Sequence, residues 1–150
     1  MIVVPDANIL LRIVEKTSGQ HAIALAAVSA LRLRGHTLRT VPQCFYEFWT
    51  VGTRPIANNG LGLSTAEVDQ EVAKHLSFFP LLNDTPALFS EWRSLVLAYD
   101  CKGKVAHDAR MVAAMRTHNL THILTFNVND FARFPGITVL NPSAVSAATP

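Results

Sequence analysis

The chain begins with a short apolar run that a proline stops and a carboxylate follows. Residues 2–4 are all β-branched and do not alternate with polar residues, which is typical of a strand buried on both faces of a parallel sheet. Pro5 lacks the N–H that a sheet ladder needs, so it belongs at the strand end. Asp6 and Asn8 are then expected at the carboxyl edge of the sheet, where α/β proteins bind ligands. Both residue types also begin helices, which is the ordinary alternative.

Strand-like and helix-like segments alternate along the rest of the chain. Capping boxes at Thr17–Gln20 and Ser64–Glu67, and a helix start at Thr85–Pro86, mark three helix beginnings. Expected helices cover residues 19–34, 44–51, 64–76, 86–99 and 105–116, with a short helix or helical turn over 9–14. Expected strands cover residues 2–4, 38–41, 78–82, 122–126 and 137–140, followed by a frayed tail. The alternation predicts an α/β fold, a three-layer α/β/α sandwich with a mostly parallel central sheet.

Length and composition favour one domain over residues 1–150. The 150 residues are 49% hydrophobic and 16% charged, which provides for a buried core and gives no sign of disorder. A net charge of +2 is too small to favour or exclude a polyanionic partner. Cys44 and Cys101 lack zinc-ligand spacing and fit a reducing cytoplasm. Neither a signal peptide nor an apolar run of about 18 residues is recognisable, so we expect no membrane segment.

Four acidic residues stand at or near expected ends of elements: Asp6, Glu47, Asp108 and Asp130. Each has an ordinary explanation taken singly, such as a helix start or a rim position beside aromatic residues. Taken together, they are expected to meet at one sheet edge. Two carboxylates about 5 Å apart repel each other by roughly 3 kcal/mol at an effective dielectric near 20, so such a cluster needs a cation. Oxygen ligands without histidine or thiolate favour Mg²⁺ or Mn²⁺ over zinc.

Four segments together resemble the PIN-domain nucleases, and more closely the VapC toxins of VapBC toxin–antitoxin pairs. The resemblance covers nearly the whole chain, and the order and spacing of the segments are more specific than any one of them. The segments are Val4-Pro5-Asp6-Ala7-Asn8, Glu47 in an aromatic helix, His107-Asp108-Ala109-Arg110, and Thr125-Phe126-Asn127-Val128-Asn129-Asp130-Phe131.

The resemblance implies a Mg²⁺-dependent endoribonuclease with RNA as substrate, a dimer, and a cognate VapB-type antitoxin as inhibitor. By position, Asp6, Glu47 and Asp108 would be the acidic metal ligands, with Asn8 and Thr125 as orienting neighbours. The fourth position is open, because Asn127 stands where the family often has an aspartate and Asp130 lies three residues further on. Whether one or two metal ions bind is therefore also open. Residues considered for phosphate contacts are Arg12, Arg54, Lys102, Lys104, Arg110 and Arg133.

Three other functions remain as alternatives to the nuclease. The first is phosphoryl transfer with Asp6 as nucleophile, although a haloacid-dehalogenase-like enzyme would carry a second aspartate where Asn8 stands. The second is a catalytically weak PIN-like module that binds RNA or a protein. The third is an ordinary α/β domain whose acidic residues only tie loops.

Overall fold

The computed structural model describes residues 1–148 and contains a parallel sheet of four strands in the order β2-β1-β3-β4. β1 (Ile2–Pro5) pairs with β2 (Thr37–Leu38) on one side and with β3 (His122–Leu124) on the other. β3 pairs in turn with β4 (Thr138–Leu140). All pairs are parallel, which confirms the fold class that the alternation predicts.

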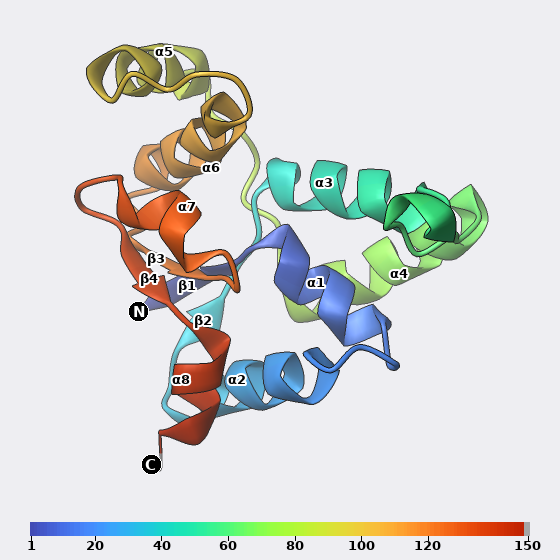
Figure 1. Ribbon diagram of the computed structural model, residues 1–150. Helices are drawn as coiled ribbons and strands as arrows, with labels where there is room; N and C mark the ends of the chain where they lie inside the picture. Colours follow the sequence, from blue (N-terminus) through green and yellow to red (C-terminus); the bar gives the residue numbers. More distant parts are fainter. Residues whose placement is uncertain (149–150) are drawn as a thin grey trace.

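Helices cover both sides of this sheet. In Figure 1, α5 and α6 lie on one side of the strands and α2 and α8 on the other. α5 packs against α6, α2 against α8, and α1 against both α2 and α3. The helices are α1 (Ala7–Val14), α2 (His21–Leu33), α3 (Pro42–Thr53), α4 (Thr65–Phe78), α5 (Leu88–Ala98), α6 (Val105–Thr117), α7 (Val128–Ala132) and α8 (Pro142–Ala147), with a short 3₁₀ turn over Ile56–Asn58.

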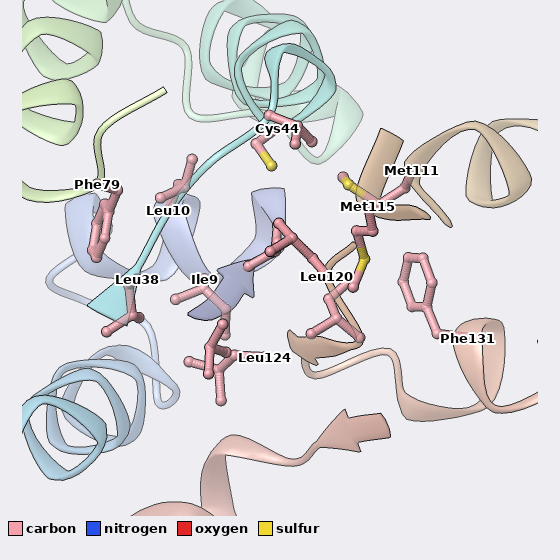
Figure 2. Packing of buried hydrophobic residues seen from close by; sticks show 14 of the residues in the cluster. Ile9, Leu10, Leu38, Cys44, Phe79, Met111, Met115, Leu120, Leu124 and Phe131 are labelled. Atoms are coloured by element: carbon pink, nitrogen blue, oxygen red, sulfur yellow. The ribbon is translucent and has the colours of Figure 1, made fainter. Parts of the chain in front are cut away.

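The core explains why the strands lack alternation. Val3, Val4, Ile123 and Leu124 are fully buried, as expected for central strands covered on both faces. Figure 2 shows the apolar cluster running from α1 past these strands to the methionines of α6. The predicted two-sided burial of residues 2–4 is therefore confirmed for Val3 and Val4 and is wrong for Ile2, which is 37% exposed at the start of the strand.

The sheet order places a topological switch between β1 and β3. From β1 the chain first returns to one side as β2 and later to the other side as β3. The Asp6 N–H donates to the Leu124 carbonyl at 3.0 Å, so the segments after the two strands leave the sheet side by side. A crevice at such a point is where open α/β sheets bind ligands.

The predicted strand over residues 78–82 is wrong. Phe78 ends α4, and Leu81 makes an isolated parallel bridge with Thr40. Pro80 has no N–H, and its carbonyl accepts from Thr40 at 3.1 Å before Leu82 donates back to Thr40 at 2.8 Å. The pairing therefore covers a single bridge and does not extend into a strand.

Two of the three predicted helix starts are also wrong. Gln20 forms no side-chain cap, because its Oε1 accepts from Arg12 Nε at 2.9 Å while Ser18 Oγ accepts from the Gln20 N–H. α5 begins at Leu88, after a turn in which the Leu88 N–H donates to the Thr85 carbonyl at 3.1 Å. The capping box of Ser64 and Glu67 is confirmed, with both reciprocal bonds present.

The expected frayed tail is a helix for most of its length. Asn141 Oδ1 accepts from the Ser143 N–H at 2.9 Å and begins α8, with Pro142 in its first turn. Arg34 of the α2 end donates to the carbonyls of Val145 and Ala148 at 3.1 and 2.7 Å. Residues 149 and 150 lie outside the described residues. Within residues 1–148, no helix combines the length and apolarity that crossing a bilayer requires.

Candidate active site

A cavity of about 700 Å³ opens at the switch point between β1 and β3. It takes residues from the end of β1, from α1, α3 and α6, and from the segment after β3. The four acidic residues that the sequence places at element ends, Asp6, Glu47, Asp108 and Asp130, all line it. The four residues therefore lie around one cavity at the edge of the sheet where they were expected to meet.

Asp6 is fixed by a network that joins the ends of β1 and β3. The residue is 5% exposed; its Oδ1 accepts from the Ala7 N–H at 2.8 Å, which begins α1. Its Oδ2 accepts from Thr125 Oγ1 at 2.8 Å and from Asn8 Nδ2 at 3.0 Å. The Thr125 hydroxyl also accepts from Asn8 Nδ2 and from the Asn127 N–H, both at 3.0 Å.

This network gives Asn8 and Thr125 defined tasks. The Thr125 hydroxyl is fully buried and donates its one proton to Asp6, so its lone pairs are left for the two N–H donors. Asn8 is oriented by the Phe126 N–H, which donates to Asn8 Oδ1 at 3.2 Å. The two side chains therefore set the direction in which the Asp6 carboxylate faces the cavity.

Glu47 lies on α3 and is held from a residue one helical turn earlier. Gln43 Nε2 donates to Glu47 Oε1 at 2.9 Å and to the His107 carbonyl at 2.7 Å. Gln43 Oε1 accepts from Arg110 Nη1 at 3.1 Å, and Arg110 also pairs with Asp84 at 3.1 Å. Gln43 is 5% exposed and connects α3 to α6 behind the acidic residues.

Sequence reasoning does not single out Gln43. The available signal is its position four residues before Glu47, which places both side chains on one face of a helix. A lone glutamine in an aromatic helix has many ordinary roles. Its contact with α6 depends on the tertiary fold.

The cavity raises the pKa of two of its carboxyl groups. Burial raises the pKa of Asp6 to about 6, with Glu47 and Asp108 adding to the rise and the Thr125 hydrogen bond opposing it. Burial also raises the pKa of Asp108 to about 6, and the charges of Asp130 and Glu47 add to it. Because burial and neighbouring negative charges both oppose the ionisation of Asp6 and Asp108, positive charge is favoured in this site.

Both candidates for the fourth position reach the cavity. Asn127 is exposed, and its backbone N–H is committed to Thr125. Asp130, in the first turn of α7, is the largest source of charge repulsion on Asp108. Asp130 therefore brings the charge that Asn127 lacks.

The acidic side chains surround the cavity and do not form a closed cage. Within residues 1–148, no group of three or more Asp, Glu, His or Cys side chains converges at metal-binding distance. The cavity is wide, and its carboxyl groups come from separate elements, which accounts for the spacing.

Half of the basic residues considered for phosphate contacts line the cavity: Arg54, Lys104 and Arg110. Within residues 1–148, neither Arg54 nor Lys104 forms an ion pair. The other three have different partners: Arg12 pairs with Glu15, Lys102 pairs with Asp100, and Arg133 donates to the Tyr99 carbonyl. The cavity is thus lined by four carboxyl groups and by two cations, Arg54 and Lys104, that form no ion pair among residues 1–148.

Several solved structures share this fold. The toxin–antitoxin complex VapBC2 of Rickettsia felis, bound to a promoter DNA fragment, has a TM-score of 0.67 at 15% identity and covers 94% of this chain and 98% of its own. VapBC-1 of nontypeable Haemophilus influenzae has a TM-score of 0.67 at 12% identity, covering 95% and 99%. VapC20 of Mycobacterium tuberculosis, a sarcin–ricin loop cleaving toxin, has a TM-score of 0.63 at 16% identity, covering 87% and 93%.

The structural likeness covers almost the whole of each neighbour at low identity, so it concerns the fold alone. No curated protein sequence matches the chain. The family model for the PIN domain matches residues 3–137, which includes residues 3–5 of β1, all of β3 and every acidic residue of the cavity. The chain belongs to the PIN domain family.

Proposed function

We propose that the protein is a Mg²⁺-dependent endoribonuclease and the toxin of a type II toxin–antitoxin pair. The observation that carries this proposal is the gathering of Asp6, Glu47, Asp108 and Asp130 around one cavity at the sheet's switch point. Burial first, and repulsion from neighbouring carboxylates second, raise the pKa of Asp6 and of Asp108, and both effects favour a bound cation.

The donor set fits a hard divalent cation. Carboxylate and amide oxygens suit Mg²⁺ and Mn²⁺, and Mg²⁺ usually keeps several waters while binding one or two carboxylates and substrate phosphates. Asp6, Glu47 and Asp108 line one cavity but do not converge at metal-binding distance within residues 1–148, so water would have to complete the coordination of an ion there. Asp6, Glu47 and Asp108 would hold the ion, and Asp6 Oδ1 accepts a single hydrogen bond, which leaves it a lone pair.

The chain's own residues then have separable roles. A bound divalent ion supplies a more acidic water ligand and positive charge for the phosphodiester in its transition state. Thr125 and Asn8 hold Asp6 in one orientation, and Gln43 does the same for Glu47. Arg54 and Lys104 are placed to neutralise RNA phosphates at the cavity walls. No side chain has to act as a covalent nucleophile.

The proposed partners come from the same family setting. The structural neighbours VapBC2 and VapBC-1 are toxin–antitoxin assemblies, and VapC20 is named for cleaving the sarcin–ricin loop. For this chain we propose an RNA substrate, a VapB-type antitoxin that covers the acidic cavity, a homodimeric state and action in the cytoplasm.

Cleavage of a structured RNA tests the proposal. The wild type is expected to cut in Mg²⁺ or Mn²⁺ and to stop on addition of EDTA, while Asp6→Ala and Asp108→Asn lose at least a hundredfold of the rate, as expected when a metal ligand's charge is removed. Asp69→Asn, an exposed carboxylate on α4, is the matched control and should cut normally. If all four proteins cut equally, the activity is a contaminant. If none cuts but RNA binds, the chain is a binding module.

A further inference from the structure

A second cavity of about 530 Å³ adjoins the acidic one and is apolar in character. Its walls come from the turn before α5, from α5 itself and from the first turns of α6. Thr85, Leu88, Phe89 and Trp92 line one side. The function proposed above uses none of them.

Two aromatic rings give this cavity flat walls, and a hydrogen bond holds one of them, Trp92, in position. Phe89 is 68% exposed, and its ring centroid lies 5.8 Å from that of Trp92, with 39° between the ring planes. Trp92 Nε1 donates to the Ala106 carbonyl at 2.8 Å, which ties the indole to α6. An occupant would therefore meet surfaces that are already oriented.

The two cavities share His107 and Arg110. His107 directly precedes Asp108 on α6, so the apolar and the acidic cavity meet along the first turns of this helix. Arg110 is fixed between Gln43 and Asp84, each at 3.1 Å, and its guanidinium lies 5.8 Å from the Tyr46 ring centroid. A fixed cation at the boundary suits an occupant that carries negative charge on the side of the acidic cavity.

The wall also contains a polar group without a partner. Thr85 Oγ1 is buried and is the one such side-chain oxygen within residues 1–148 that lacks a hydrogen-bond partner. An apolar side chain of a protein would leave that hydroxyl unsatisfied. A heterocyclic base carries donors and acceptors on its edge that can supply the missing bond.

We propose that the groove between α5 and α6 is a nucleobase subsite, which takes one unpaired base of the RNA against Phe89 and Trp92 while its phosphate passes Arg110. The assignment rests on the proposed nuclease function and deepens it. Every base has a π face, so stacking on such walls tolerates any sequence, and the Thr85 hydroxyl gives one point of discrimination between bases.

Tryptophan fluorescence reports this subsite directly. The chain has two tryptophans, and Trp49 lines neither cavity, so Trp49→Phe leaves Trp92 as the single reporter. In this background, Asp6→Asn keeps RNA intact in Mg²⁺. A short single-stranded oligoribonucleotide is expected to quench Trp92 and saturate. Adding Phe89→Ala should weaken its affinity about tenfold. Leu97→Ala, 75% exposed on the same helix, should bind like the parent.

Abasic substitutions identify the base. Removing one base near the scissile phosphate should weaken binding about tenfold in the parent and little in Phe89→Ala, because both changes abolish the same stack. Thr85→Val should alter the preference among the four bases at that position. Equal RNA affinity of Phe89→Ala and its parent, no quenching of Trp92 by RNA, or quenching by an apolar peptide alone would overturn the subsite.

These outcomes separate the subsite from the nuclease. Metal-dependent cleavage that is unchanged by Phe89→Ala would keep the nuclease and remove the subsite. RNA-dependent quenching that Phe89→Ala weakens, in a protein that cuts no RNA, would keep the subsite and remove the nuclease.

Discussion

Asp108 shows, at the scale of one residue, how burial and neighbouring charges oppose the ionisation of a carboxyl group in this site. Its pKa is raised to about 6 by burial, by Asp130 and by Glu47, while Lys104 and His107 lower it. Because the folded protein binds this proton more tightly than the unfolded chain does, ionising Asp108 reduces stability. That reduction is absent below about pH 3.8, grows as pH rises, and is complete above pH 6.

Asp108→Asn is therefore expected to stabilise the metal-free protein by about 1 kcal/mol at pH 7, a value reduced from the full shift because solvent screens a half-buried group. The gain should vanish by pH 4. Urea unfolding in EDTA at both pH values measures it, with Asp69→Asn as the exposed control. A loss of stability at pH 7 would mean that Asp108 mainly stabilises the first turn of α6.

The roles of Asn8 and Thr125 illustrate what a sequence can and cannot give at this scale. Their placement beside Asp6 follows from strands that end at a common edge, so the resemblance identifies them correctly as neighbours. Gln43 could not be identified in this way. Its partners His107 and Arg110 are more than sixty residues away in the sequence, and no local pattern predicts the contact.

At the scale of elements, Gln43 joins α3 to α6 through two side-chain hydrogen bonds, with His107 and Arg110, and holds Glu47 of α3 through a third. Gln43→Ala leaves the His107 carbonyl and Arg110 without this partner in a nearly buried position. We expect a loss of about 2 kcal/mol in the free energy of unfolding, together with weaker Mn²⁺ binding, because Glu47 is no longer held. Calorimetric titration and urea unfolding measure the two effects. Gln70→Ala, exposed on α4, is the control. Unchanged Mn²⁺ affinity would contradict the positioning role.

The predicted helices and strands agree with the structure where residues close in sequence determine them. Ser64 and Glu67 contact each other across one turn, and α6 is rich in alanine and methionine, which are good helix formers. The errors arise where distant residues decide. Gln20 loses its capping role to Arg12, and α8 depends on Arg34, which lies more than a hundred residues earlier. α7 is five residues long and lies outside every predicted element, because short helices carry little periodicity.

At the scale of the whole molecule, a bound cation should link the acidic cavity to global stability. A ligand that binds only the folded state stabilises it by about 2.7 kcal/mol at a concentration of 100 times its Kd. Mn²⁺ is therefore expected to raise the melting temperature of the wild type and of Asp69→Asn, and to leave Asp6→Asn nearly unchanged. Equal shifts in all three proteins would indicate nonspecific binding outside the cavity.

The stability of the protein at acid pH depends on His75 of α4, which does not line the acidic cavity. It is 3% exposed, its Nε2 has no hydrogen-bond partner among residues 1–148, and its ring lies 5.0 Å from that of Phe48. Burial lowers its pKa from 6.5 to about 4, so its contribution to stability is complete above pH 6.5 and is lost as pH falls toward 4. Relative to the wild type, His75→Phe should gain about 2 kcal/mol between pH 7 and pH 5. Urea unfolding at both pH values measures this gain, and a difference independent of pH would show that the pKa of His75 is the same in the folded and the unfolded protein.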